Sequence, residues 1–292
     1  MRRHAPYGHK VTMNVFRMLL WPWRGQRRHR DPVDAAPLPE LTLEQYERLT
    51  PHQVLHEGEM PVVYLTPNRV TQWRVNSLFT KEPDTIEWIR GFQPGEVFVD
   101  IGANVGMYTI WAAKTRGVRT FAFEPESQNY ALLCRNIVMN GLTGSVVAYC
   151  LALADKSDYS LLHLSEFQTG GSCHSFGEKV DFQLQQHEFA LAQGCVGSTL
   201  DTLVATGAVP MPDHIKIDVD GLEHKVLAGS RTVLANPALK SVLVEINTNL
   251  QLHRQIVADM QAAGFSYSED QVAAAQRREG TFKGVGNYVF RR

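Results

Sequence analysis

Residues 97–106 combine the residue types from which a cofactor site is built. The apolar run 97–101 contains one carboxylate, Asp100. The loop that follows contains Gly102, Ala103, Asn104 and Gly106. Glycines allow a chain to turn sharply and bring backbone N–H groups close to a ligand. A dinucleotide-binding loop has the pattern G-x-G-x-x-G, whereas Asn104 replaces the middle glycine here. Because a carboxylate suits an ammonium group better than a pyrophosphate, Asp100 favours a zwitterionic cofactor such as S-adenosylmethionine.

Two further carboxylates follow later strands. Glu124 ends the next predicted strand, 24 positions after Asp100, where an acidic residue accepts hydrogen bonds from ribose hydroxyls and repels a 2′-phosphate. Asp155 comes just after a third predicted strand, within reach of an adenine amino group. The alternative is that Asp155 belongs to an Asp-Lys-Ser turn. The predicted cofactor-binding residues are Asp100, Gly102, Ala103, Asn104, Gly106, Glu124 and Asp155.

A second acidic cluster lies in a run that reads IKIDVDG. Side chains alternate between the two faces of a strand, so Lys216, Asp218 and Asp220 are predicted to share one face. Open α/β sheets bind ligands at the carboxyl ends of their strands, and we expect this face to point into that crevice. Glu223 falls in the first turn of a following helix, and Glu245 ends the following strand.

The elements that must position these residues alternate between strands and helices, which indicates an α/β fold with a parallel sheet. Apolar or β-rich runs predict strands at 97–101, 118–123, 146–153, 215–219, 242–246 and 288–290. Helical patterns occupy 107–114, 128–140, 222–234 and 251–263. Asp84 and Glu87 have the spacing of a capping box at the start of an earlier helix. Residues 156–210 are the least regular, and an insertion there serves either as a substrate lid or as a surface hairpin without a role.

Eight stretches of the chain, in order, resemble the FkbM-type S-adenosylmethionine-dependent methyltransferases over residues 60–292. The stretches are KEPDTIEWI (81–89), VFVDIGANVGMYT (97–109), FAFEP (121–125), NIVMNGL (136–142), LALAD (151–155), TLDTL (199–203), IKIDVDGLEHKVLAGS (215–230) and LVEIN (243–247). The resemblance implies a class I methyltransferase (Rossmann-like) fold, with a mostly parallel sheet, helices on both faces and an antiparallel final strand. It also implies methyl transfer to a hydroxyl oxygen of a sugar, a glycan or a secondary metabolite. The commonest family form has Glu at the position of Asp220, so this chain keeps the charge and shortens its reach.

Methyl transfer to a hydroxyl requires linear approach of the oxygen to the methyl group and removal of the hydroxyl proton. Asp218 is the predicted group that accepts this proton or orients the acceptor oxygen. Lys216 either holds that carboxylate ionised, or stabilises the developing alkoxide, or forms a structural salt bridge. In a different interpretation, acidic side chains ligate a magnesium ion, although clustered carboxylates more often form ion pairs and helix caps. The candidate ligands are Asp218, Asp220, Glu223 and Glu245.

Composition limits the class of protein. The chain has 292 residues, of which 44% are hydrophobic and 20% charged, which excludes a mostly disordered chain. Four cysteines without C-x-x-C spacing argue against a disulfide scaffold and a structural zinc site, and favour a reducing compartment such as the cytoplasm. Residues 31–292 hold 21 basic and 30 acidic residues, which argues against nucleic-acid binding.

The N-terminal segment differs from the rest. Residues 1–30 contain eight Lys or Arg and no Asp or Glu. The apolar run 11–23 is shorter than the roughly 20 residues that span a bilayer. We therefore weigh peripheral contact of this tail with an anionic membrane surface against a poorly ordered extension. A proline-rich linker follows, so the predicted organisation is a tail and linker over 1–39 and a methyltransferase domain over 40–292.

Two rival functions belong to other classes. An NAD-dependent oxidoreductase would use a similar sheet, but the missing glycine and Asp100 count against it. A catalytically silent protein that binds the cofactor and recruits partners is the other rival, and retention of Asp100, Glu124 and Asp218 argues against it. Turnover of a bound methyl donor distinguishes an enzyme from a binding protein.

Overall fold

The structure is a computed structural model that describes residues 41–292. These residues belong to two compact units, divided between Leu49 and Thr50. The first unit contains helix α1 (Leu43–Arg48), which begins at a capping box formed by Thr42 and Gln45. The predicted tail and linker over 1–39, including the membrane contact weighed for residues 1–30, lie outside the described residues.

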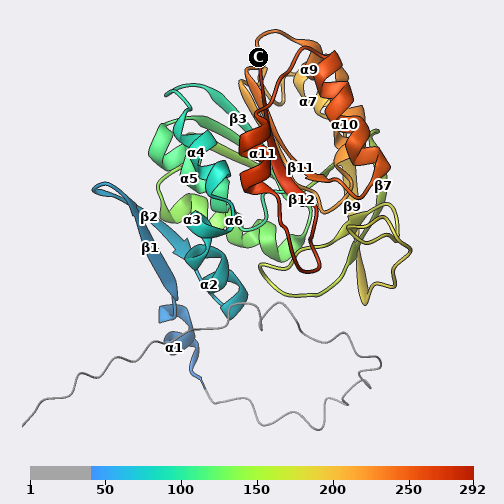
Figure 1. Cartoon of the computed structure of the whole chain (residues 1–292). Helices are drawn as coiled ribbons and strands as arrows, with labels where there is room; N and C mark the ends of the chain where they lie inside the picture. The colour runs from blue at the N-terminus through green and yellow to red at the C-terminus, as the bar shows by residue number, and fades with distance from the viewer. Residues whose placement is uncertain (1–40) are drawn as a thin grey trace, which may run out of the picture. The chain divides into compact units, whose positions relative to one another are not determined.

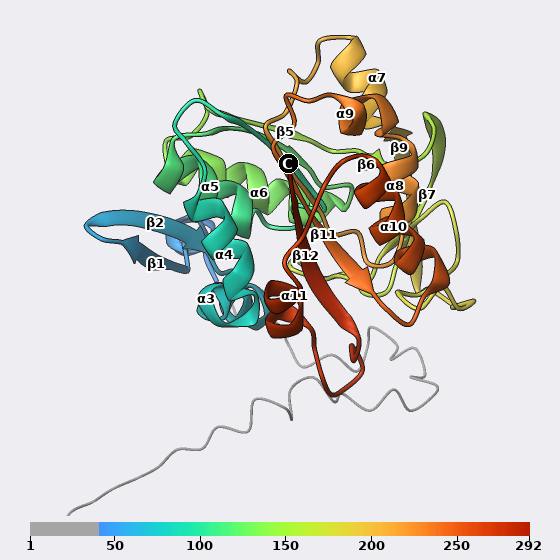
Figure 2. The same cartoon turned by 45° about the horizontal axis from the view of Figure 1, so that its top comes forward.

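The second unit is built on a six-stranded sheet in the order β12-β11-β10-β3-β4-β5 (Figures 1 and 2). Its strands are β3 (Val97–Ile101), β4 (Arg119–Phe123), β5 (Val146–Tyr149), β10 (His214–Ile217), β11 (Ser241–Asn247) and β12 (Val285–Arg291). Neighbouring strands run parallel except β12, which is antiparallel to β11. The predicted fold class, an α/β fold with a mostly parallel sheet and an antiparallel final strand, is therefore confirmed.

Helices cover both faces of this sheet (Figure 2). Helices α4 (Pro83–Arg90), α5 (Met107–Arg116) and α6 (Ser127–Met139) contribute to the core on one face. Helices α7 (Leu200–Ala205), α8 (Glu223–Ala228), α9 (Arg231–Ala235) and α10 (Gln251–Ala262) contribute to the core on the other. Helix α11 (Glu269–Ala275) packs beside β12, where Gln271 accepts a hydrogen bond from the Val289 N–H. Among the described residues, no helix is long and apolar enough to cross a membrane.

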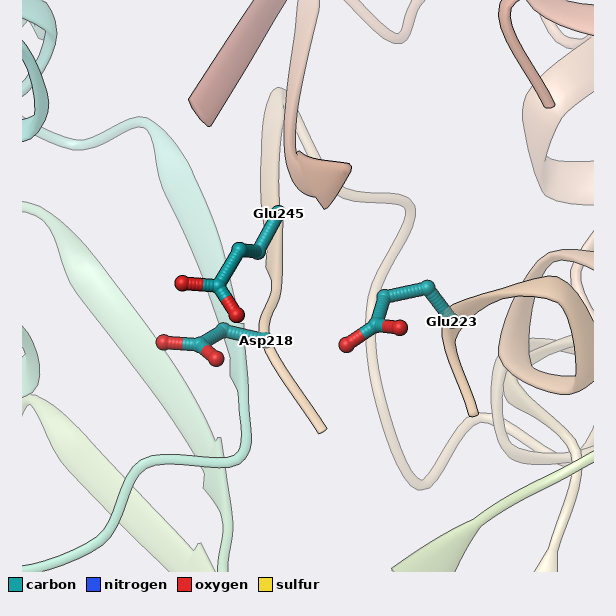
Figure 3. Close-up of side chains that lie close together, drawn as sticks. All are labelled: Asp218, Glu223 and Glu245. Atoms are coloured by element: carbon teal, nitrogen blue, oxygen red, sulfur yellow. The ribbon is translucent and has the colours of Figure 1, made fainter. Parts of the chain in front are cut away.

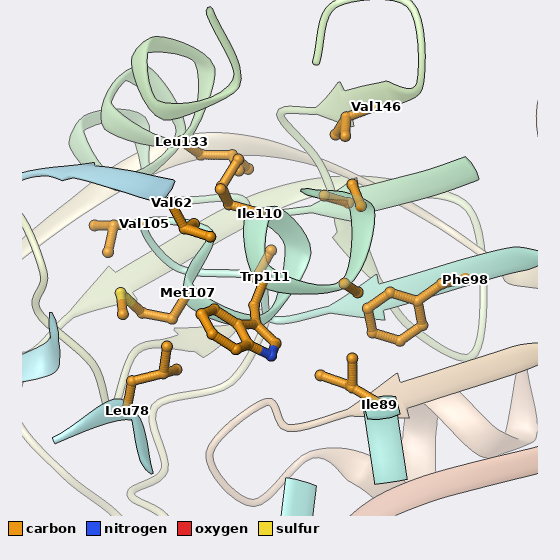
Figure 4. Close-up of a cluster of buried hydrophobic side chains, with 14 of the residues drawn as sticks. Val62, Leu78, Ile89, Phe98, Val105, Met107, Ile110, Trp111, Leu133 and Val146 are labelled. Carbon is orange, nitrogen blue, oxygen red and sulfur yellow. The ribbon is translucent and has the colours of Figure 1, made fainter. Parts of the chain in front are cut away.

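The two faces of the sheet differ where they reach the site. Along β3, Phe98 belongs to the first core, beside Ile110 and Trp111 of α5 (Figure 4). Val99 belongs to the second core. Full burial of such side chains stabilises the fold by roughly 1.5–3 kcal/mol each. Strand alternation places Asp100 on the Phe98 face, so a carboxyl group lies buried at the carboxyl end of an otherwise apolar strand.

A hairpin and two short helices precede the sheet. Strands β1 (His52–Glu57) and β2 (Met60–Leu65) form the hairpin, and helices α2 (Arg69–Asn76) and α3 (Leu78–Lys81) follow it. The side chain of Asn136 in α6 accepts a hydrogen bond from the Leu65 N–H at 2.9 Å, and that of Asn140 accepts one from the Val63 N–H at 2.9 Å. These bonds hold β2 against α6 and so set where α2 and α3 begin.

Residues 156–210 are more regular than predicted. They contribute to a four-stranded sheet in the order β6-β9-β7-β8. Its strands are β6 (Ala152–Leu153), β7 (Asp158–Leu164), β8 (Ser175–Phe176) and β9 (Leu191–Ser198). The predicted strand 146–153 is therefore wrong as one element, because its last two residues pair with β9 in this second sheet. Local hydrophobicity shows that both pieces are extended and does not show which sheet each one joins.

Two predicted helix features also differ. The predicted capping box at Asp84 and Glu87 is wrong, because the N-cap of α4 is Glu82 and Asp84 lies inside the helix, which begins at Pro83. Proline suits the first helical position, since its fixed φ matches a helix and its missing N–H would be unpaired there. The predicted helix 222–234 is interrupted at Gly229, where a Cβ would lie 2.0 Å from the carbonyl oxygen of Ala154.

Candidate functional site

The site lies where the strand order reverses. β10 pairs with β3, while the chain after β3 continues to β4 and β5 on the opposite side. In open α/β sheets, ligands bind beyond the carboxyl ends of the strands at such a switch point. Here those ends meet directly, since Ile217 pairs with Ile101 and the Asp218 N–H donates to the Ile101 carbonyl at 3.2 Å. The two acidic clusters found in the sequence are thereby brought together.

Gly102 permits this contact. It has φ of +76°, and a Cβ at this position would lie 1.8 Å from the backbone carbonyl oxygen of Asp218. Any other residue would both strain the backbone and push the two loops apart. Cofactor binding by Gly102 stays a prediction, but the structure gives this glycine a structural function: it lets the loop 102–106, which we call the cofactor loop, touch the end of β10.

A cavity opens beside this junction, and we call it the first cavity. Four of the predicted site residues line it together with Asp220, namely Gly102, Asn104, Glu124 and Asp218. Apolar groups from the sheet edge line another part, among them Phe123, Leu153 and Ala154. The insertion supplies Leu162 from β7, Phe176 from β8, and Gly171, Ser172 and His174 from the segment between these strands. The insertion therefore lines this cavity, which the lid interpretation requires, and its role as a substrate lid stays a prediction.

Glu124 lies in the wall of the first cavity. Its carboxyl oxygens accept backbone N–H groups from Asn104 and Glu126, each at 2.8 Å. Burial raises the pKa of Glu124 to about 7, although these two hydrogen bonds act in the opposite direction. Each oxygen keeps a second lone pair, so Glu124 retains the capacity to accept hydrogen bonds from two ribose hydroxyls.

Asn104 connects the cofactor loop to the insertion. It adopts a left-handed conformation with φ of 51°, which asparagine tolerates better than most residues. Its side-chain amide donates to the carbonyl oxygen of Gly171 at 2.7 Å. The residue that replaces the expected middle glycine thus keeps the backbone geometry of a glycine and adds a bond to the opposite wall of the cavity.

The other predicted cofactor residues lie farther from the first cavity. Asp100 is 1% exposed and lines neither of the two cavities described here. Its Oδ2 accepts the Thr109 hydroxyl at 2.6 Å, and its Oδ1 has no hydrogen-bond partner among residues 41–292. Asp155 is exposed directly after Ala154, which does line the first cavity. Gly106 is the N-cap of α5, with φ of +87°.

A second cavity adjoins the first. The two share Gly102, Asn104 and Asp218. The remaining lining residues are Arg74, Ser77, Leu78, Lys81, Ala103, Met107, Tyr108 and Lys216. They come from α2, α3, the cofactor loop, α5 and β10, so the helices that follow the hairpin close one side of this space.

Lys216 and Asp218 form an ion pair at the boundary between the cavities. The Lys216 ammonium is 3.2 Å from Asp218 Oδ2 and 3.7 Å from Asp100 Oδ1, and it lies over the Tyr108 ring. Burial alone would lower the pKa of Lys216, but the carboxylates of Asp218 and Asp100 raise it above its usual range. Lys216 therefore stays protonated and is a hydrogen-bond donor in this site, not a base.

Three carboxyl groups at this edge lie close together: those of Asp218, Glu223 and Glu245 (Figure 3). Glu223 is already engaged, because it accepts backbone N–H groups from Val219 and Gly221 and so braces the loop after β10. Glu245 pairs with Arg277 at 3.2 Å. Burial raises the pKa of Glu223 to about 8 and that of Glu245 well above its usual range. In the alternative to a magnesium site, clustered carboxylates form ion pairs and caps. The contacts of Glu223 and Glu245 are of these two kinds.

Asp220 does not share a strand face with Lys216 and Asp218. β10 ends at Ile217, and Asp220 has φ of 55°, so the predicted shared face of Lys216, Asp218 and Asp220 does not continue to the last residue. Its Oδ2 accepts the Cys173 N–H of the insertion at 2.7 Å. Burial, followed by repulsion from Asp218, raises the pKa of Asp220 to about 6. Asp220 faces the first cavity and does not belong to the group of three carboxylates.

Sequence reasoning missed the charged groups contributed from outside the two motifs. Glu82 is buried, accepts the Tyr108 hydroxyl at 2.8 Å and pairs with Lys81 at 2.6 Å. Arg277, from the segment after α11, pairs with Glu82 at 3.4 Å. The stretch 81–89 belongs to the family resemblance and could therefore have indicated the site, but its local pattern predicts only the start of a helix. Nothing in the local pattern around Arg74 or Arg277 indicates a site.

The chain is similar in sequence to known methyltransferases. The model of the methyltransferase FkbM domain matches residues 100–267, more than half of the chain. The 31-O-demethyl-FK506 methyltransferase FkbM of Streptomyces tacrolimicus is 25% identical over 198 residues, covering 61% of this chain and 76% of that protein. The hexuronic acid methyltransferase AglP of Haloferax volcanii is 26% identical over 181 residues, covering 61% of this chain and 67% of that protein.

Among solved structures, the crystal structure of methyltransferase FkbM from Methylobacillus flagellatus is similar at 14% identity with a TM-score of 0.44. That match covers 69% of this chain and 44% of the other. The family match includes the cofactor loop, Glu124 and the whole IKIDVDG run, which are the segments that meet at the switch point. Methyltransferases of this kind use S-adenosylmethionine. The chain belongs to the FkbM family of methyltransferases.

Proposed function

We propose that this protein transfers a methyl group from S-adenosylmethionine to a hydroxyl oxygen of a sugar, a glycan or a secondary metabolite. The observation that carries the proposal is the position of Asp218 in the lining of both cavities. A cofactor in the first cavity and an acceptor in the second would meet at this carboxylate. The names of the two relatives are consistent with the acceptor class, since one refers to a 31-O-demethyl compound and the other to a sugar acid.

The first cavity fits the cofactor in shape and charge. Phe123, Leu153 and Leu162 offer an apolar slot for an adenine ring, and Glu124 offers acceptors for ribose hydroxyls. S-adenosylmethionine carries one net positive charge, from its sulfonium. The charged groups of the first cavity are three carboxyl groups and one ammonium, that of Lys225, which suits a cationic ligand.

The residues of this chain supply positioning and proton transfer. When bound, the cofactor supplies an electrophilic methyl group. The Asp218 carboxylate would accept the proton of the acceptor's hydroxyl group as that oxygen takes the methyl group, and the products would be a methyl ether and S-adenosylhomocysteine. Lys216 donates a hydrogen bond to Oδ2, and no group among residues 41–292 hydrogen-bonds Oδ1, which therefore remains free to face the acceptor.

The proposal is tested by calorimetric titration of the full chain with S-adenosylhomocysteine, with NADH run alongside, followed by turnover of methyl-labelled S-adenosylmethionine with sugars and lipid-linked glycans. We expect micromolar binding of S-adenosylhomocysteine, no binding of NADH, and transfer of label to a hydroxyl-bearing acceptor. Failure to bind S-adenosylhomocysteine would overturn the proposed cofactor site. Labelled nitrogen or carbon in the product would overturn O-methylation.

A further inference from the structure

The charges that line the second cavity are mainly positive. Arg74, Lys81 and Lys216 contribute three cationic groups, whereas Asp218 contributes the one carboxylate. The first cavity has the opposite balance. A cofactor with a net positive charge gains nothing from the second cavity, so its cations suit a different ligand, one that carries negative charge.

The three cations are not equally available to a ligand. Lys216 is enclosed, 1% exposed, between two carboxylates. Lys81 pairs with Glu82 at 2.6 Å, although its side chain remains 36% exposed. Arg74 forms no ion pair among the described residues, but the charge of its guanidinium lowers the pKa of the Asp220 carboxyl, so these two groups interact at longer range. The Arg74 Nε donates a hydrogen bond to the carbonyl oxygen of Gly170 at 2.8 Å.

Arg74 is thus held by one nitrogen while its two terminal amino groups have no hydrogen-bond partner among residues 41–292. Burial or half-burial of a cation is costly unless something compensates for lost water. A guanidinium presents two parallel N–H donors that match a carboxylate or a phosphate. Its anchor to the insertion fixes the guanidinium before the ligand arrives, which reduces the entropy lost on binding.

We propose that the methyl acceptor carries an anionic group, a carboxylate or a phosphate, which Arg74 binds with assistance from Lys81. The inference rests on the proposed function and narrows its acceptor class. A sugar whose anionic group lies on Arg74 would place its ring in the second cavity and its hydroxyl toward Asp218, the residue that both cavities share. Arg74 and Lys81 are positioning residues in this account, because they act on the acceptor away from the reacting oxygen.

The test is calorimetric titration of the full chain, saturated with S-adenosylhomocysteine, with D-glucuronate, D-glucose 6-phosphate and D-glucose. We expect at least one of the two anionic sugars to bind about tenfold or more tightly than glucose, and the preferred one identifies a carboxylate or a phosphate as the natural group. Arg74→Gln should remove most of this preference, and Lys81→Gln should reduce it by about threefold. Arg69→Gln is the matched control, because Arg69 is an exposed residue of the same helix that lines neither cavity.

The outcomes separate this inference from the proposed function. If the wild-type chain does not bind S-adenosylhomocysteine, both the anionic acceptor and the proposed function are overturned. If it binds S-adenosylhomocysteine but binds the three sugars equally, or binds neither anionic sugar, only the anionic acceptor is overturned. If Arg74→Gln weakens S-adenosylhomocysteine and leaves sugar binding unchanged, Arg74 serves the cofactor's own carboxylate and the inference is wrong. Thermal unfolding of each variant shows that a loss of binding is not a loss of folding.

Discussion

The first and second cavities are neighbours built on the same strand ends, yet they are suited to opposite charges. They share Gly102, Asn104 and Asp218. The first adds Glu124 and Asp220, which come from the ends of the sheet strands, and the second adds Arg74 and Lys81, which come from helices before the sheet. The carboxylates at the sheet edge are thus combined with cations supplied by a separate part of the chain. In our proposal this combination divides the space between a cationic cofactor and an anionic acceptor.

The two regions also differ in how much of each was predictable. The loop 102–106 and Glu124 follow buried strands at fixed spacing, so the sequence predicts that they meet at one edge. Asp218 follows from the same argument applied to β10. The burial of Asp100 beneath the loop was not predictable, because strand alternation gives the face of a residue but not what covers it.

The second cavity is formed by tertiary contacts, which produce no recognisable pattern in the local sequence. Arg74 lies in the helix that follows β2, and long-range hydrogen bonds to Asn136 and Asn140 hold β2 in place. Such long-range contacts are not encoded in hydrophobic periodicity. The second sheet was missed for the same reason, since pairing of β6 with β9 joins residues far apart in sequence.

The largest expected effect comes from removing the shared carboxylate. Asp218→Asn should lower kcat by about 100- to 10,000-fold, because the acceptor hydroxyl loses its proton acceptor. The dissociation constant for S-adenosylhomocysteine should change by less than about threefold. Single-turnover transfer of labelled methyl measures the first effect, calorimetry measures the second, and Asp270→Asn, an exposed residue of α11, is the control. Near-normal turnover in Asp218→Asn would show that Asp218 is not the proton acceptor.

The next effect tests the junction of the two cavities. Gly102→Ala should lower the free energy of unfolding by about 2–4 kcal/mol and abolish binding of S-adenosylhomocysteine, because the new methyl overlaps the Asp218 carbonyl. Gly95→Ala is the matched control, since Gly95 has φ of +86° and open space around its Cβ. Chemical denaturation of both variants separates the overlap from the backbone strain. Equal losses of stability in Gly102→Ala and Gly95→Ala would show that the close contact between Gly102 and the Asp218 carbonyl is not required.

A smaller effect distinguishes the first cavity from the second. Glu124→Gln should weaken S-adenosylhomocysteine by about tenfold, because an amide cannot accept hydrogen bonds at both positions. Binding of an anionic sugar should be unchanged, since Glu124 lines only the first cavity. Glu188→Gln, an exposed change in the insertion, is the control. Unaltered affinity for S-adenosylhomocysteine in Glu124→Gln would place the ribose elsewhere.

The smallest effect is a pH dependence of stability. The Glu124 pKa is about 7 in the folded protein and near 4.5 when unfolded, so folding retains a proton that the unfolded chain releases. Stability from this group is therefore present below pH 4.5 and is lost as pH rises toward 7. Between pH 6 and pH 7 the free energy of unfolding should fall by about 1 kcal/mol on this account. Denaturation at each pH should show that this part of the slope disappears in Glu124→Gln, and an unchanged slope would contradict the assignment.

The division of the two cavities is tested most directly by a crystal structure of the full chain with S-adenosylhomocysteine bound. The account predicts an adenosine in the first cavity, with its ribose hydroxyls within hydrogen-bond distance of Glu124, and a sulfur atom that faces Asp218. The space between Arg74 and Lys81 should remain open to solvent. A homocysteine carboxylate bound to Arg74, or an adenosine in the second cavity, would contradict the account.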